Sequence, residues 1–228
     1  MKFLDRLERK LGRYAIQGLM TYIVVGNLVV FMLDLVLPQL GIPGKLALIP
    51  SEVLKGQVWR LVTYIFIPPT YSIVFIFFTL YFYYIIGNTL EGLWGSFRLN
   101  VYYLAGMIGT TIAALITGYS DATHLNLSLF LAFAHLFPNH EVLLFFFLPV
   151  KMKYLAWLNW AFIAITVIIA PLGGKIAAIV SVLNFLLFFG PDIIKGIRNR
   201  RNAYMKRKNF YRQLEEGRRA NRENLWKQ

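Results

Sequence analysis

The chain has 228 residues, of which 57% are hydrophobic, and its mean hydropathy of +0.55 excludes a soluble domain of this length. It contains no cysteine, so disulfides and thiolate metal sites are excluded as well. The net charge of +13 would suit a nucleic-acid partner, but the positions of the basic residues give a different explanation.

Six apolar runs approach or reach the length of about 17–25 residues that is expected of helices crossing a bilayer core. In chain order they lie at about 15–37, 71–90, 99–118, 122–138, 154–171 and 174–191. The fourth run is the shortest and the most polar. We therefore expect an all-α integral membrane protein whose membrane domain, residues 14–192, is a bundle of six transmembrane helices.

Residues 1–13 precede the first run and are rich in charge. Leu4, Leu7 and Leu11 fall on one helical face, which predicts a basic amphipathic helix along the membrane surface. No small-residue cleavage site follows the first apolar run, so we expect this run to be retained rather than removed as a signal peptide.

Residues 38–70 form the one long connection between the runs, and Pro and Gly punctuate it. Such a long connection in a compact domain is usually functional or disordered. Its many apolar residues predict a long first extracytoplasmic loop that lies in the membrane interface. A separate apolar stretch, Leu143–Val150, is too short to span the membrane and is expected to be re-entrant or interfacial.

The basic residues concentrate on one side of the predicted topology, which holds 20 of the 24. This distribution predicts that both termini lie in the cytoplasm. Residues 193–228 form a basic tail, with twelve basic and three acidic residues from Lys195 onward. At about 1 kcal/mol per basic residue near the surface, we expect the tail to bind anionic lipids. No nucleic-acid partner is expected.

Three sequence motifs follow one another along the chain, and their order and spacing can be compared with those of known membrane proteins. They are "GQVWRLVTYIFIPPT", "IIGNTLEGLWGSFRLNVYYLAGMIG" and "LAFAHLFPNHEVLLFFFLPVKMKYLAWL". In order and spacing they resemble the rhomboid superfamily of intramembrane proteases. The resemblance implies a six-helix rhomboid-like scaffold. The residues that carry its structural motif are Trp59, Arg60, Gly87, Glu91, Gly95 and Arg98.

The same resemblance implies positions for a catalytic serine and a catalytic histidine, and this chain has neither residue at the corresponding position. The serine position falls on Thr123, and the histidine position falls on Ser181 or, in a shifted frame, on Asn184. The positions that would help to stabilise an oxyanion align with Phe75 and Thr79. A serine hydroxyl without a nearby base is a poor nucleophile. We therefore expect no catalytic residue and interpret the chain as a pseudoprotease.

Two other classes of protein stay open. His124 and Ser128 are four residues apart on one helical face, so they could form the dyad of an intramembrane serine endopeptidase. A small-solute transporter would instead use the polar face of the fourth run as a path, although no inverted repeat is visible. No metal site is expected, because His124 and His135 lie about 16 Å apart along the helix.

These observations together predict a pseudoprotease that binds transmembrane client proteins in the lipid bilayer. Polar residues inside membrane runs mark contacts or pathways. The predicted groove is formed by Asn126, Ser128, Ser181 and Asn184. Asn159 is interpreted as joining helices by hydrogen bonding. No cofactor is expected, and the compact chain and its topology suggest a bacterial plasma membrane.

Overall fold

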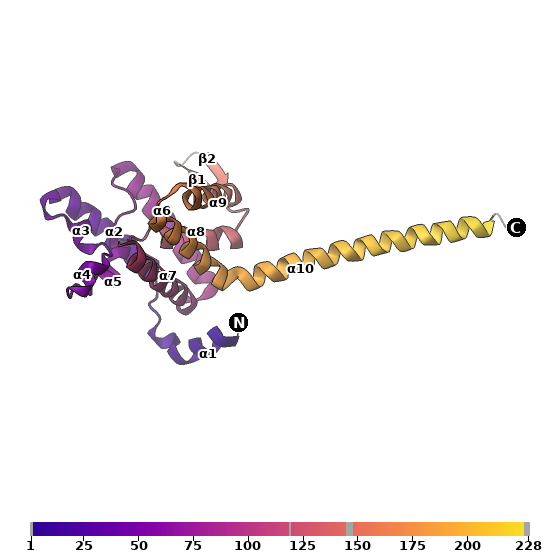
Figure 1. The fold of residues 1–228 in the computed structure, drawn as a ribbon, viewed down its shortest axis with the longest axis horizontal. Coiled ribbons are helices and arrows are strands. Elements are labelled where there is room, and N and C mark those ends of the chain that lie inside the picture. Colours follow the sequence, from indigo (N-terminus) through magenta and orange to yellow (C-terminus); the bar gives the residue numbers. More distant parts are fainter. Residues whose placement is uncertain (1, 119, 145–147, 226–228) are drawn as a thin grey trace. The chain divides into compact units, whose positions relative to one another are not determined.

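The computed structural model describes residues 2–118, 120–144 and 148–225 (Figure 1). The chain divides into two compact units, one ending at Phe185 and one beginning at Leu186. The first unit contains the helix bundle, and the second contains the C-terminal part of the last helix.

Five helices within the described residues are long and apolar enough to cross a membrane. They are α2 (Leu19–Val36), α6 (Ile73–Trp94), α7 (Ser96–Thr117), α9 (Met152–Ile169) and α10 (Leu172–Leu225). The first four have 18 or 22 residues and measure about 27–33 Å, against about 30 Å for a bilayer core. These helices confirm the prediction of an α-helical integral membrane protein.

The prediction of six membrane-spanning helices is not confirmed, because the fourth apolar run forms the short helix α8 (Thr123–Leu136). Its 14 residues measure about 21 Å, which is less than the thickness of the bilayer core. Local chemistry sets both ends. The Asp121 carboxylate accepts a hydrogen bond from the Thr123 amide (2.9 Å), and Phe137 precedes Pro138, which disfavours helical backbone.

The long first connection is built of short helical turns. They are η2 (Pro38–Leu40), α3 (Ile42–Leu46), α4 (Pro50–Leu54), α5 (Arg60–Thr63) and η3 (Tyr64–Phe66). A proline stands in the first turn of η2, α3 and α4, where its missing N–H has no helical partner to lose. The Ser120 amide donates to the Leu48 carbonyl (3.0 Å) and so ties the connection to the segment that follows α7.

The N-terminal segment forms α1 (Lys2–Leu11) and η1 (Gly12–Tyr14), where the spacing of the leucines predicts a helix. Arg98 at the start of α7 pairs with Asp5 (2.8 Å) and Glu8 (3.1 Å) of α1. These ion pairs hold α1 against the bundle. Because all three side chains are partly exposed, each pair contributes about 0–1 kcal/mol. The place of α1 at a membrane surface stays a prediction.

A two-stranded hairpin precedes α9 and is the exception to the helical architecture among the described residues. Strands β1 (Glu141–Leu144) and β2 (Leu148–Lys151) pair antiparallel, with Glu141 opposite Lys151. The Met152 amide donates to the His140 carbonyl (2.9 Å) and continues the pairing into α9. The stretch expected to be re-entrant or interfacial therefore turns back as a hairpin, and its residues 145–147 lie outside the described part of the chain.

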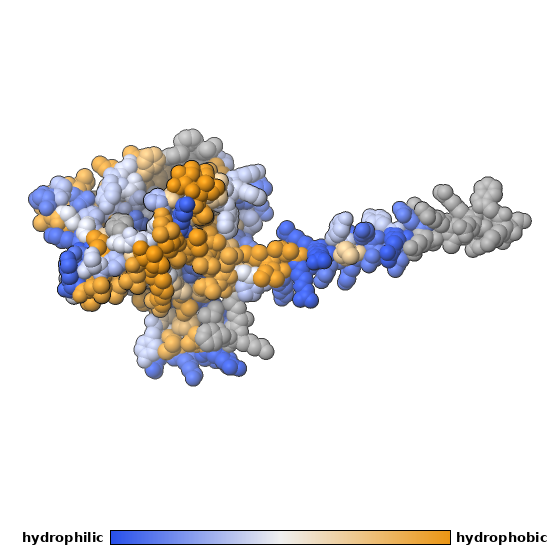
Figure 2. All heavy atoms as spheres, viewed as in Figure 1, coloured by the Kyte–Doolittle hydropathy of each residue, from blue (hydrophilic) through white to orange (hydrophobic). Residues whose placement is uncertain are grey.

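The bundle has an apolar outer surface as well as an apolar core. Buried side chains come from several helices, such as Met20 of α2, Ile86 of α6, Tyr102 of α7 and Leu129 of α8. Figure 2 shows hydrophobic residues over much of the bundle surface and hydrophilic residues over α1. Ile169 at the end of α9, for example, is 77% exposed. This surface requires a lipid environment.

The last helix does not end where the sequence suggests. The predicted membrane domain ends at residue 192, but α10 continues through Pro191 and past this boundary to Leu225. A proline inside a helix removes one backbone hydrogen bond, and the helix can resume beyond it. The basic residues of the tail from Lys195 to Arg222 therefore lie on a helix.

Candidate functional site

Arg60 holds the first connection together, and only 6% of its surface is exposed. Its Nη1 donates to the carbonyl oxygens of Gly44 (2.7 Å) and Ala47 (2.8 Å), and its Nε donates to Oε1 of Gln57 (2.7 Å). Trp59, the other member of the predicted pair, is 51% exposed. Of this pair, only Arg60 therefore has an evident role in the folded connection.

Glu91 joins three helix ends. Its Oε1 accepts hydrogen bonds from the Gly18 amide at the start of α2 (2.8 Å) and from the Ser96 hydroxyl at the start of α7 (2.6 Å). Gly95 lies between α6 and α7 with φ of 82°, a left-handed conformation that favours glycine. The predicted motif residues Glu91 and Gly95 are thus brought together at the α6–α7 turn.

Two glycines allow neighbouring helices to approach closely. A Cβ atom at Gly87 of α6 would overlap the Met20 side chain of α2. A Cβ atom at Gly106 of α7 would overlap Leu125 and would lie 2.9 Å from Nδ2 of Asn184. Small residues at such positions let helix backbones come together in lipid.

Ser128 is fully buried between α7 and α10. Its hydroxyl hydrogen-bonds the Tyr102 hydroxyl (2.6 Å) and accepts a bond from Nδ2 of Asn184 (3.1 Å). Ser181 lines the same small cavity, and its hydroxyl donates to the Ala178 carbonyl (2.8 Å). This cavity has a volume of about 10 Å³, which is about the volume that one water molecule requires. The cluster joins helices and has no room for a substrate.

The alternative dyad of His124 and Ser128 lines this small cavity too. Among the described residues, the side-chain partners of the Ser128 hydroxyl are Tyr102 and Asn184. A nucleophile must reach the atom that it attacks, and Ser128 is 0% exposed. The geometry therefore does not support an endopeptidase that uses this pair.

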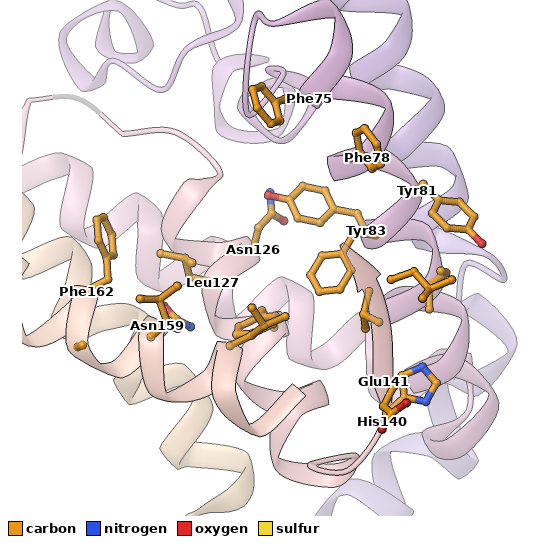
Figure 3. A pocket seen from close by; sticks show the side chains of 18 of the residues that line it. Phe75, Phe78, Tyr81, Tyr83, Asn126, Leu127, His140, Glu141, Asn159 and Phe162 are labelled. Carbon is orange, nitrogen blue, oxygen red and sulfur yellow. The ribbon is translucent and has the colours of Figure 1, made fainter. Parts of the chain in front are cut away.

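A much larger cavity of about 860 Å³ lies between α6, α8 and α9 (Figure 3). The wall on α6 runs from Phe75 to Ile85, and the wall on α9 runs from Leu155 to Ile165, so each is about 15 Å long. The short helix α8 packs against both neighbours and lines the deep side. Phe75 and Phe162 are half exposed and mark the side on which the cavity opens.

Two buried carboxamides line this otherwise mostly apolar cavity. Asn126 of α8 is 6% exposed and Asn159 of α9 is 7% exposed. The Tyr83 hydroxyl hydrogen-bonds the Asn126 side chain (Figure 3). However, Oδ1 of Asn126 and both polar atoms of Asn159 have no hydrogen-bond partner among the described residues. Each such buried atom costs about 1–3 kcal/mol, so these atoms favour a ligand that can pair with them.

The predicted groove residues divide between two places. Ser128, Ser181 and Asn184 gather around the small cavity, whereas Asn126 lines the large one. Asn159, interpreted from the sequence as joining helices, lines the large cavity instead. Its signal in the sequence is a single carboxamide in the middle of an apolar run. A carboxamide in such a run indicates a buried polar group, but it does not indicate whether a residue of another helix hydrogen-bonds with that group.

Residues 17–189 of the chain match DUF1751, a family described as eukaryotic integral membrane proteins. The match begins just before α2 and extends into α10, so it contains both cavities. No curated protein matches the chain.

This match corrects two predictions. The assignment to the rhomboid superfamily is wrong, because the family that matches is a different one. The prediction of a bacterial plasma membrane is wrong, because the matching family is eukaryotic. The residues behind the resemblance have local roles that many helix bundles require. Arg60 holds a folded connection, Gly87 admits a neighbouring helix, and Glu91 joins helix ends. Such residues report on packing and hydrogen bonding rather than on descent.

Proposed function

The chain belongs to the DUF1751 family of eukaryotic integral membrane proteins, and from that premise we propose that it binds a transmembrane helix of a client protein. The client helix enters sideways from the lipid into the large cavity between α6, α8 and α9, here named the α6–α9 cavity. The observation that carries the proposal is a large cavity with mostly apolar walls, one of which belongs to α6 and one to α9.

The size of the α6–α9 cavity fits part of one helix. A volume of about 860 Å³ equals about 11 Å of a cylinder 10 Å across, which is two turns of an α-helix with its shorter side chains. The walls of about 15 Å are long enough for those two turns. The cavity therefore suits the middle of a transmembrane segment.

The short length of α8 explains why the space exists. A helix of about 21 Å cannot fill the gap between α6 and α9 over the full thickness of the bilayer. A client helix completes the packing there. Because lipid and cavity walls are both apolar, van der Waals packing and interhelical hydrogen bonds supply the affinity.

The second unit supports an additional contact with the membrane surface. Between Lys195 and Arg212, α10 carries eight basic residues and no acidic one, and all of them are exposed. We propose that this basic segment lies against anionic lipid headgroups, each basic residue near the surface contributing about 1 kcal/mol. This contact is independent of the α6–α9 cavity.

Photocrosslinking in a eukaryotic membrane tests the client proposal. A photoreactive amino acid replaces Phe162 in the wall of the cavity, and a matched control replaces Ile112 of α7, which is exposed but does not line the cavity. We expect protein adducts at position 162 whose crosslinked peptides map within transmembrane segments of other proteins. The control position should give mainly lipid adducts. Lipid adducts alone at both positions would contradict the proposal.

A further inference from the structure

The α6–α9 cavity is lined by two buried carboxamides that have polar atoms without partners, Asn126 and Asn159. Asn159 is the eighth of the 18 residues of α9, so it lies about 2 Å from the middle of that helix. Asn126 hydrogen-bonds Tyr83, which is the eleventh of the 22 residues of α6. Asn159 therefore lies near the middle of α9, and Asn126 lies within hydrogen-bonding reach of a tyrosine from the middle of α6.

This depth excludes ordinary lipid as the partner that satisfies them. The bilayer core is about 30 Å thick, so headgroups lie about 15 Å from its middle. Acyl chains fill the middle and have no hydrogen-bonding atoms. A partner for Asn126 and Asn159 must therefore bring its polar group on an otherwise apolar segment that crosses the membrane.

The free atoms also define the kind of polar group. Oδ1 of Asn126 and Oδ1 of Asn159 accept hydrogen bonds, and Nδ2 of Asn159 donates. A side-chain amide matches these atoms in kind, because its NH₂ can donate to a carboxamide oxygen and its own oxygen can accept from a carboxamide NH₂. The histidine and the carboxylate that line the cavity, His140 and Glu141, belong to its β1 end (Figure 3). Neither provides a charge at the middle of the walls for an ionised partner.

We infer that the cavity selects client helices that carry an asparagine or glutamine near the middle of the membrane. This inference rests on the proposed function, since it names the feature by which a client helix is recognised. Asn126 and Asn159 act as specificity-determining residues, and the apolar walls bind the rest of the helix.

The test measures binding of synthetic transmembrane peptides to the full-length protein in phosphatidylcholine vesicles. Three Leu/Ala helices of about 20 residues carry no polar residue, a central Gln, or a Gln near one end. Because the chain has no cysteine, a single Lys153→Cys substitution accepts a dye for energy transfer to a labelled peptide. Peptide-to-lipid ratios are kept below those at which the peptides associate with one another.

We expect the peptide with the central Gln to bind about 3- to 30-fold more tightly than the other two, as interhelical hydrogen bonds in membranes allow. Asn159→Leu, and the double variant Asn126→Leu/Asn159→Leu, should lose this preference, so that each variant binds the three peptides with equal affinity. The matched control Asn184→Leu removes a buried carboxamide from the small cavity and should keep the preference. Thermal unfolding of each variant shows whether it is folded.

The possible failures are distinguishable. Equal binding of all three peptides, or a preference that persists in both Asn159→Leu and the double variant, overturns the inference and leaves the proposed function standing. If none of the three peptides shows more energy transfer to this protein than to an unrelated membrane protein, the proposed function itself is overturned.

Discussion

Arg60 and Asn159 are both buried polar side chains, and they differ in what surrounds them. Arg60 donates three hydrogen bonds within the first connection, whereas Asn159 makes none with the described residues. A satisfied buried group stabilises the fold, while an unsatisfied one costs free energy of folding. At the scale of the residue, this difference separates side chains that hold the structure from side chains available for binding.

Replacing Arg60 should destabilise the protein. Arg60→Ala leaves the Gly44 and Ala47 carbonyls without this donor, and we expect a loss of about 1–3 kcal/mol for each one that stays unpaired. Arg60→Lys should recover only part of the loss, because an ammonium group cannot replace the guanidinium fork. Thermal unfolding in detergent measures the effect. Lys55→Ala, which removes an exposed ion pair, is the control and should change little.

Removing the carboxamide of Asn159 should not destabilise the protein in the absence of a client. Asn159→Leu removes two polar atoms without partners, so we expect equal or higher stability, by about 1 kcal/mol. Asn27→Leu is the matched comparison. It removes bonds from Nδ2 to the carbonyls of Ile23 (2.8 Å) and Ile65 (3.1 Å) and should lower stability. Equal losses in the two variants, measured by thermal unfolding, would show that Asn159 has a structural partner.

At the scale of the element, the close packing of helices α2 and α6 depends on Gly87. Gly87→Ala places a Cβ atom where the Met20 side chain lies, and we expect this overpacking to cost about 1–3 kcal/mol. Gly92→Ala on the same helix meets no atom within 4 Å and should stabilise α6 by up to about 1 kcal/mol. Opposite signs in thermal unfolding are expected. A Gly87→Ala protein as stable as Gly92→Ala would rule out the close contact.

The basic segment of α10 is the second element with a testable role. A fluorophore that senses polarity, attached through Tyr211→Cys, should report a more apolar environment when the vesicles contain anionic lipid. Substituting Lys206, Arg207 and Lys208 together by Gln should weaken this association by about 3 kcal/mol. High salt should weaken it in the unchanged protein as well. Identical emission in neutral and anionic vesicles would contradict lipid binding by this segment.

For the whole molecule, the open cavity between α6 and α9 should decide whether client helices bind. Ala161 lines this cavity, so Ala161→Trp should fill part of it and reduce the binding of transmembrane peptides by at least about tenfold, or about 1.4 kcal/mol. Ala164 is exposed on the same helix and does not line the cavity, which makes Ala164→Trp a matched control. Energy transfer to a labelled peptide gives the affinities. Equal affinities for the two variants would place the binding surface elsewhere.

The fold was predictable where length and apolarity decide it. Five of the six predicted runs form long apolar helices, and their ends lie a few residues from those expected, except that α10 continues far beyond residue 191. The length of the fourth run was overestimated because apolarity alone ignores the local chemistry at its ends, where the Asp121 carboxylate accepts a hydrogen bond from the Thr123 amide and Pro138 follows the last turn. The hairpin β1–β2 was missed because a short apolar stretch has no period that identifies strands.

The candidate site was predictable only as a set of polar residues in membrane runs. The sequence by itself determined that the chain is an integral membrane protein and that Asn126, Ser128, Asn159 and Asn184 are buried in it, because apolar length and isolated polar residues are local properties. Only the tertiary structure decided which of them are satisfied. Ser128 and Asn184 pair across helices, while Asn126 and Asn159 line an open cavity with free polar atoms. Hydrogen bonding between helices depends on how distant segments pack, and no local pattern in the sequence contains that information.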